Sequence, residues 1–250
     1  MTNDEPIRIF IGFDRREVVA FNVLAYSILL RSSSPVSICP LMLSQLEGLL
    51  IRRREALQST DFSFSRFLVP HLSGYRGFSI FMDCDMLILD DIAKLWSLRD
   101  ENYAVQVVKH DHRPTEKTKF LGEPQSRYQK KNWSSVMLMN NARCRALTPE
   151  YVNSATGLEL HQFKWLGSDA EIGALPHCWN HLVGYDAPGN DVALAHFTRG
   201  GPYFAEFAGC EYAEHWRADR EAMLYAGRAP LQRPDAGSTH PTAMEAAPVR

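Results

Sequence analysis

Short apolar runs alternate with longer, largely apolar stretches along the first part of the chain, and this alternation predicts strands separated by helices. The first β-rich run, residues 7–12, ends at a glycine, and a helix is predicted to follow over about 16–30. Apolar positions cover nearly the whole circumference of that helix, so we expect it to be buried against a sheet. Further strands are predicted at 36–43, 78–82, 103–108, 135–140 and 191–197, with a helix containing Phe64, Phe67 and Leu68 before the strand at 78–82.

Strands that alternate with helices indicate βαβ units, so the sequence predicts an α/β fold with a mainly parallel central sheet flanked by helices. A length of 250 residues suits one domain with a sizeable core. A terminal amphipathic helix is predicted over 209–226, with Tyr212, Trp216 and Met223 on one face. Residues 228–250 contain prolines but no aromatic residue. We therefore expect a single domain over 1–227 and a disordered tail over 228–250.

The composition excludes several classes of protein. Lys and Arg total 27 against 29 Asp and Glu, a net charge of -2, so the chain lacks the basic excess of a nucleic-acid binder. The five cysteines lie singly, which argues against a zinc framework or a disulfide scaffold. The start of the chain is polar and acidic, and no apolar run reaches the about 18 residues that span a membrane. We expect a cytoplasmic protein without a nucleic-acid partner; peripheral association with the inner face of a membrane remains compatible with these features.

The strongest chemical signal is the pair Asp83 and Asp85, which directly follows the apolar run 78–82. Two carboxylates beside an apolar core have no stabilising task there, because an unpaired buried charge is costly. Open α/β sheets also bind their ligands at the carboxyl ends of strands. Carboxylate oxygens suit Mg²⁺ or Mn²⁺, so the pair predicts a divalent-cation site, with a solvated turn that caps a helix as the alternative. Asp90 and Asp91 are better placed for such a cap.

The order of these segments resembles glycosyltransferase family 8, a family of retaining enzymes with the GT-A fold that includes glycogenin and bacterial lipopolysaccharide glycosyltransferases. The resemblance covers roughly residues 7–203 and implies a Rossmann-like, mainly parallel sheet. It also implies that Asp83-Cys84-Asp85 is the D-x-D motif that binds Mn²⁺ (or Mg²⁺) together with the diphosphate of a nucleotide-sugar donor. The segment 195–203 resembles the late family segment H-F-x-G-x-x-K-P-W, which makes His196 the third metal ligand.

The same resemblance implies donor contacts in the first part of the chain. Gly12, Phe13 and Asp14 match the family's nucleotide pocket, in which the aspartate contacts the base. Asp14 also stands where an N-cap of the following helix belongs, and the two interpretations have equal support. Arg66 lies in a segment, 65–70, that resembles the helix before the D-x-D motif, whose arginine reaches the donor.

Further donor contacts are implied in the second half of the chain. Asn132, Ser134 and Ser135 belong to a segment that resembles the family's N-x-G-V-x-L-x-N strand beside the sugar, with serine where glycine is usual. Gly200 and Gly201 would allow backbone N–H groups to approach the diphosphate.

Three features depart from the family pattern. The late lysine is missing, and Arg199 is the nearby cation that would neutralise the leaving phosphate, with a fork geometry unlike that of lysine. The family's Asp-Gln pair becomes Asp169-Ala170; Asp169 is still a candidate for binding the sugar hydroxyls, with helix capping as the alternative. The segment Lys109-His110-Asp111 has no clear family counterpart, and it either contacts acceptor or donor or is an ordinary loop.

These features together predict transfer of a hexose from a nucleotide diphosphate sugar, with UDP as the expected nucleotide, to a glycan, lipid or other hydroxyl acceptor. The resemblance implies retention of configuration and assigns catalytic roles to Asp169 and Arg199. A non-catalytic module that binds sugar nucleotides or glycans is an alternative, because the glutamine is absent. A nucleotidyltransferase is less well supported, because the residues after the first strand lack a loop rich in glycine and basic residues that would hold a triphosphate. The donor sugar, the acceptor and the oligomeric state are not determined by the sequence.

Overall fold

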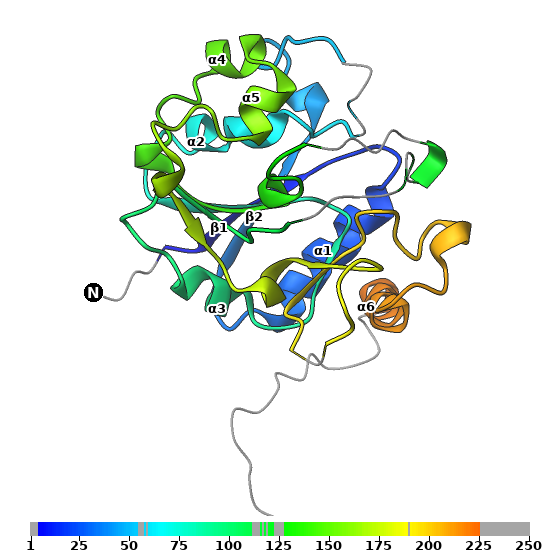
Figure 1. The fold of residues 1–250 in the computed structure, drawn as a ribbon. Coiled ribbons are helices and arrows are strands. Elements are labelled where there is room, and N and C mark those ends of the chain that lie inside the picture. The colour runs from blue at the N-terminus through cyan, green and yellow to red at the C-terminus, as the bar shows by residue number, and fades with distance from the viewer. Residues whose placement is uncertain are drawn as a thin grey trace, which may run out of the picture.

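The fold is seen in a computed structural model that describes residues 5–54, 58, 60–111, 116, 118, 120–122, 128–189 and 191–225. A six-stranded sheet lies at the centre, and helices cover both of its faces (Figure 1). The predicted α/β class is therefore confirmed. The predicted disordered tail, 228–250, lies outside the described residues.

Parallel strands form one half of the central sheet. β1 (Ile7–Gly12) is hydrogen-bonded on one side to β2 (Val36–Leu41) and on the other to β3 (Phe78–Met82), and both run parallel to it. The boundaries of β1 and β3 are those predicted, whereas β2 ends two residues earlier than expected. Because the three strands run the same way, their carboxyl ends meet at one edge of the sheet.

The other half of the sheet is mixed. β6 (Val136–Asn140) is antiparallel to both β3 and β5 (Val105–Val107), and β7 (Ile172–Ala174) is parallel to β5. The strand order is β2-β1-β3-β6-β5-β7. Three of the five neighbouring pairs are parallel, in agreement with the mainly parallel sheet that the sequence predicts.

A smaller, three-stranded sheet connects the middle of the chain to its late part. β4 (Met86–Ile88) follows β3 after a short bend and pairs antiparallel with β9 (Leu194–His196), which in turn pairs parallel with β8 (His181–Leu182). β9 is the strand predicted at 191–197, shortened at both ends. This sheet brings residues near 196 to the point where the chain leaves the carboxyl end of β3.

The helices lie in two layers (Figure 1). α1 (Val18–Arg31) and α3 (Ile92–Ser97) lie on one side of the sheet, and α2 (Val69–Leu72), α4 (Pro149–Ser154) and α5 (Gly157–His161) lie on the other. α6 (Ala213–Tyr225) packs beside α1, where Trp216 is buried and where Arg31 pairs with Asp219 at 2.6 Å. The shorter 3₁₀ helices are η1 (Leu43–Gln45), η2 (Ser65–Leu68), η3 (Phe120–Gly122), η4 (Trp133–Ser135), η5 (Asn141–Arg143), η6 (Asp169–Glu171), η7 (His177–Asn180) and η8 (Ala205–Phe207).

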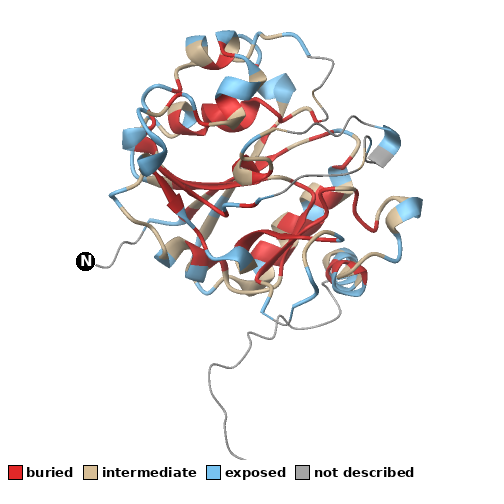
Figure 2. Ribbon diagram, in the orientation of Figure 1, coloured by how far each residue is buried: buried red, intermediate tan, exposed pale blue. Residues whose placement is uncertain are grey.

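Two predicted helices differ from the observed ones. α1 is not buried all round, and Figure 2 shows buried and exposed positions along it. Its buried residues lie on one face, whereas Leu29 is 61% exposed. The helix predicted around Phe64 and Phe67 is a 3₁₀ turn, η2, followed by the short α2, which has Pro70 in its first turn. Proline has no N–H and is tolerated in the first turn of an α-helix, so its position fits the start of a new helix there. By contrast, Asp91 caps α3 as predicted and accepts a hydrogen bond from the Ala93 N–H at 2.9 Å.

Within the described residues, none of the helices combines the length and the apolar character needed to cross a membrane.

Candidate active site

Asp83, Asp85 and His196 meet where the two sheets join. Asp83 is the first residue after β3, and Asp85 directly precedes β4. The pairing of β4 with β9 places Met86 opposite His196, and the Phe197 N–H donates to the Asp85 carbonyl at 2.8 Å. One ligand atom from each of the three side chains lies within 4.8 Å of the others. Strand pairing thus brings together the three residues that the sequence nominates as metal ligands.

The chemistry of this group fits a divalent cation. Asp85 Oδ1 lies 3.5 Å from His196 Nε2, and both side chains are almost completely buried. Two carboxylates and one imidazole provide three ligands of the kind that Mn²⁺ accepts, and Mg²⁺ also prefers carboxylate oxygens. Such ions keep further positions for phosphate oxygens or water, so three protein ligands leave room for a donor diphosphate.

Asn180, to which the sequence analysis assigns no role, orients His196. Its Oδ1 lies 2.9 Å from His196 Nδ1, and its Nδ2 donates to Ser135 Oγ at 2.9 Å and to the Asn132 carbonyl at 3.3 Å. With its amide nitrogen donating to these two groups, Asn180 presents its oxygen to the imidazole as an acceptor. The hydrogen-bond network therefore assigns the proton to Nδ1 and leaves the lone pair of Nε2 directed towards Asp85, which is the tautomer that a metal ligand requires.

Arg66 holds the other side of the site. Its Nη1 lies 2.8 Å from Asp83 Oδ1 and also donates to the Ser134 carbonyl at 2.8 Å. The guanidinium is buried, 4.9 Å from the centroid of the Phe81 ring and 5.3 Å from that of Phe62. The family resemblance implies a donor contact for Arg66, and the structure places its guanidinium directly against Asp83.

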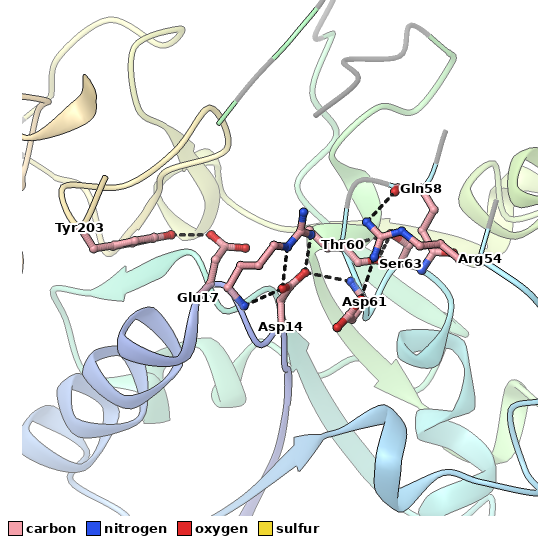
Figure 3. Close-up of polar contacts among 9 residues, drawn as sticks. Asp14, Glu17, Arg54, Gln58, Thr60, Asp61, Ser63 and Tyr203 are labelled. Atoms are coloured by element: carbon pink, nitrogen blue, oxygen red, sulfur yellow. Dashed lines mark hydrogen bonds and ion pairs between the residues drawn. The ribbon is translucent and has the colours of Figure 1, made fainter. Parts of the chain in front are cut away.

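Asp14 is enclosed in its own hydrogen-bond network at the end of β1. Its carboxylate accepts from the side chain of Arg16 at 2.7 Å and from the Asp61 N–H at 3.0 Å (Figure 3). Burial raises the pKa of Asp14, but the hydrogen bonds from Arg16 and Asp61 outweigh it and the pKa is lowered from its ordinary value. The N-cap interpretation is wrong, because α1 begins at Val18 and its N-cap is Glu17. Asp14 instead closes the turn between β1 and α1.

Close packing surrounds Gly12 and Phe13. A Cβ on Gly12 would lie 2.4 Å from the ring of Phe62, so only glycine fits at the end of β1. The Phe13 ring packs edge-to-face on Phe21, with centroids 5.4 Å apart. These contacts give both residues a packing role in addition to the nucleotide contact that the resemblance implies.

Glu17, which is fully buried, and Tyr203, which is partly buried, form a pair that the sequence analysis missed. The Tyr203 hydroxyl donates to Glu17 Oε1 at 2.7 Å (Figure 3). Burial and the nearby carboxylates of Glu17 and Asp85 raise the pKa of Tyr203 well above its ordinary value. The Tyr203 ring also covers Gly201, where a Cβ would lie 2.3 Å from it. The pair therefore fastens the late glycine segment to the start of α1.

The serine segment supports the site through its backbone and hydroxyl groups. Asn132 has a left-handed backbone (φ 65°), and its carbonyl accepts from Ser135 Oγ at 2.7 Å. Ser134 Oγ lies 2.8 Å from His161 Nδ1. Cys84, between the two aspartates, is fully buried, and burial raises the pKa of its thiol well above the ordinary value.

Three predicted site residues are engaged with other partners. The Asp169 carboxylate is 74% exposed and lies 2.5 Å from Lys130 Nζ, and this hydrogen bond lowers the pKa of Asp169. Its helix-capping interpretation is wrong, because Ser168 is the N-cap of η6. Arg199 Nη1 lies 3.7 Å from Glu116 Oε1. Gly200 has a φ of 140°, a conformation that favours glycine, and its N–H donates to the Phe197 carbonyl at 2.7 Å.

Comparison with known proteins finds one close relative in sequence. The chain is 46% identical over 226 residues to Protein CDI of Arabidopsis thaliana, and the alignment covers 87% of each protein. No model of a known protein family matches the chain.

Comparison of structures finds glycosyltransferases. The apo-form glycosyltransferase GlyE of Streptococcus pneumoniae TIGR4 matches 89% of the chain with a TM-score of 0.59 and 14% identity, and the chain spans 63% of the length of that protein. The galactosyltransferase LgtC, in complex with donor and acceptor sugar analogues, matches 86% of the chain and 96% of its own with a TM-score of 0.55 and 12% identity. At this identity the likeness establishes the fold, which is the GT-A type. Membership of family 8 remains a prediction.

Proposed function

The chain belongs to the family of Protein CDI of Arabidopsis thaliana, and for this member we propose a glycosyltransferase activity that depends on a divalent cation. The reaction is the transfer of a hexose from a nucleotide diphosphate sugar, with UDP as the nucleotide, to a hydroxyl of a glycan, a lipid or another acceptor. We place it in the cytoplasm, where a lipid-linked acceptor would be reached at the inner face of a membrane. The observation that carries the proposal is the meeting of Asp83, Asp85 and His196 at the carboxyl end of β3.

Asp83, Asp85 and His196 would hold Mn²⁺, or Mg²⁺. When bound, the ion supplies positive charge that binds the donor diphosphate and stabilises it as it departs. The protein contributes by fixing the ligands before the donor arrives. Arg66 holds Asp83, and Asn180 holds His196 in the required tautomer, so little reorganisation is needed on binding.

The remaining predicted residues have proposed roles around the donor. Gly12, Phe13 and Asp14 would line the nucleotide side. The Asp169 carboxylate is exposed and would bind sugar hydroxyls after exchanging its contact with Lys130. Arg199, which is 3.7 Å from Glu116 and partly exposed, would turn towards the leaving phosphate. An exposed ion pair such as Arg199–Glu116 contributes about 0–1 kcal/mol, so turning Arg199 away from Glu116 would cost little.

We propose retention at the anomeric carbon, with the departing phosphate oxygen accepting the proton of the acceptor hydroxyl. In that reaction the glycosidic bond to phosphate breaks, the bond to the acceptor oxygen forms on the same face, and the proton passes to the leaving diphosphate. No protein base is required. The anomeric configuration of the product, read by NMR, distinguishes this course from inversion.

Thermal denaturation with UDP tests the cation site directly. UDP together with Mn²⁺ should raise the Tm of the wild-type chain, because a ligand that binds only the folded state stabilises it, by about 2.7 kcal/mol at a ligand concentration of about 100 times Kd. Asp85→Asn should abolish the shift. Asp90→Asn removes an aspartate that pairs with Lys94 on the surface and should keep the shift.

A shift that does not require Mn²⁺, or that persists in Asp85→Asn, would contradict the proposed site. Hydrolysis of UDP-sugars with Mn²⁺ then distinguishes two kinds of protein. A wild-type chain that hydrolyses them is an active transferase, and one that binds them without hydrolysis is a module that only binds sugar nucleotides.

A further inference from the structure

A second group of metal-binding side chains lies outside the candidate active site. His110, His177 and Asp186 each offer one ligand atom, and these three atoms lie within 4.8 Å of one another. The residues come from separate parts of the fold: His110 follows β5, His177 begins η7, and Asp186 follows β8. We propose that these three side chains bind a Zn²⁺ ion.

The distances between the side chains suit zinc. His177 Nε2 lies 3.4 Å from Asp186 Oδ2. Two ligands at about 2.0–2.1 Å from a tetrahedral Zn²⁺ are separated by about 3.3 Å, so an ion fits between these atoms with little movement. The planes of the His110 and His177 rings meet at 78°, and their centroids are 5.1 Å apart. The two imidazoles are therefore not stacked in parallel.

Hydrogen bonds hold the main chain of His110 and the carboxylate of Asp186. The His110 N–H donates to the Val108 carbonyl at 3.1 Å, and the His110 carbonyl accepts from Trp133 Nε1 at 2.8 Å. Asp186 Oδ2 accepts from the Leu182 N–H at 2.6 Å. Ligands held in this way lose less freedom when an ion binds. The side chain of His177 is 57% exposed, which leaves a path from solvent for the ion.

The ligand types favour zinc over the cations proposed for the first site. Imidazole nitrogens suit Zn²⁺, whereas Mg²⁺ and Mn²⁺ prefer sites richer in carboxylate oxygens, such as Asp83 and Asp85. Three protein ligands leave a fourth tetrahedral position for water. His181 lies close by, with Nδ1 4.0 Å from Asp186 Oδ2, but its Nε2 is 3.2 Å from Glu211, so we do not count it as a ligand.

A bound ion would tie together three segments that are far apart in the sequence. It would join the end of β5, the start of η7 and the loop after β8. η7 carries Asn180 at its other end, which orients His196. The ion would therefore also brace the helix that supports the candidate active site. This gives a role to the segment 109–111, which has no counterpart in the family resemblance.

Zn²⁺ titration of the full chain against a chromophoric chelator tests the second site. Asp85→Asn serves as the background, because it removes a ligand of the first site. We expect this variant to bind one equivalent of Zn²⁺. Adding His177→Ala or Asp186→Asn should weaken Zn²⁺ affinity by at least about tenfold. Removing a residue that only supports a metal ligand already lowers metal affinity by about 10- to 100-fold, and removing a ligand itself should lower it at least as much.

The matched control is His215→Ala, which removes an exposed histidine of α6. It should leave the titration unchanged. Near-ultraviolet circular dichroism of each metal-free variant checks that the fold is kept, and the exposure of His177 makes its replacement mild. Absence of Zn²⁺ binding in the Asp85→Asn background, or unchanged affinity after His177→Ala, would overturn the proposal.

The outcome is separable from the test of the proposed function. His177→Ala leaves Asp83, Asp85 and His196 in place, so UDP with Mn²⁺ should still raise its Tm. Loss of zinc binding with a retained UDP shift would support the second site alone.

Discussion

Two buried side chains hold the candidate metal ligands in place. Arg66 contacts Asp83 at 2.8 Å, and Asn180 contacts His196 at 2.9 Å. Each of these supporting residues is itself fixed by further hydrogen bonds, Arg66 to the Ser134 carbonyl and Asn180 to Ser135. At the residue scale, the site thus depends on orientation as well as on the types of side chain present.

Replacing Asn180 by alanine tests the importance of this orientation. Without the acceptor, nothing at position 180 holds the proton on Nδ1 of His196, and the imidazole is free to turn. We expect the affinity for Mn²⁺ to fall about 10- to 100-fold, the loss typical when a residue that supports a metal ligand is removed. Isothermal titration calorimetry on the folded variant measures this.

Asn22→Ala is the control for that experiment, because the Asn22 side-chain amide donates to the Val18 carbonyl within α1 on the surface. It should bind Mn²⁺ as the wild type does. Equal affinities of the Asn180→Ala and wild-type chains would show that Asn180 does not position His196.

At the scale of elements, the end of β1 and the loop that carries Phe62 are packed in direct contact. The ring of Phe62 is buried against Gly12, the last residue of the strand. Asp14 reinforces the same contact, since it accepts from the Asp61 N–H beside Phe62. The strand end and the loop therefore form one unit beside the predicted nucleotide pocket.

Gly12→Ala should separate these two elements. The added methyl group would overlap the Phe62 ring, and forcing extra volume into a packed core costs about 1–3 kcal/mol. Urea denaturation should show this loss in the free energy of unfolding. Gly209→Ala is the matched control: a Cβ there meets nothing within 4 Å, so its effect should stay within about 0.5 kcal/mol. Equal losses for the two variants would contradict the packing argument.

At the scale of the whole molecule, acid stability should depend on Asp14. Its pKa is lower in the folded chain than the ordinary value of 3.8, so its carboxylate form favours folding. That contribution is complete above the ordinary value and is lost as the pH falls through 3.8 to the folded pKa. The wild type should therefore lose more free energy of unfolding between about pH 6 and about pH 3 than Asp14→Asn does, as measured by urea denaturation.

Asp191→Asn, which changes an exposed aspartate, should retain the pH dependence of the wild type. If Asp14→Asn retains it as well, the hydrogen bonds at Asp14 do not contribute to acid stability.

The sequence by itself determined the elements whose signals are local. β1 and β3 were predicted with their observed boundaries, because each is an apolar run that ends at a glycine or an aspartate. The acidic pair Asp83 and Asp85 can likewise be recognised from the sequence, since both residues closely follow the apolar run that forms β3. The capping role of Asp91 is also a local signal, because its partner, the Ala93 N–H, is only two residues away in the sequence.

Only the tertiary structure decided which distant residues meet. The pairing of β4 with β9 brings His196 to Asp85, and the family resemblance had implied this meeting without a physical reason. The sequence gives no signal for two of the contacts, Asn180 with His196 and Tyr203 with Glu17. The residues of each pair lie in different elements, and no sequence motif links them. Periodicity reports which face of one element is apolar, but the neighbour of that face is set by the packing of the whole chain.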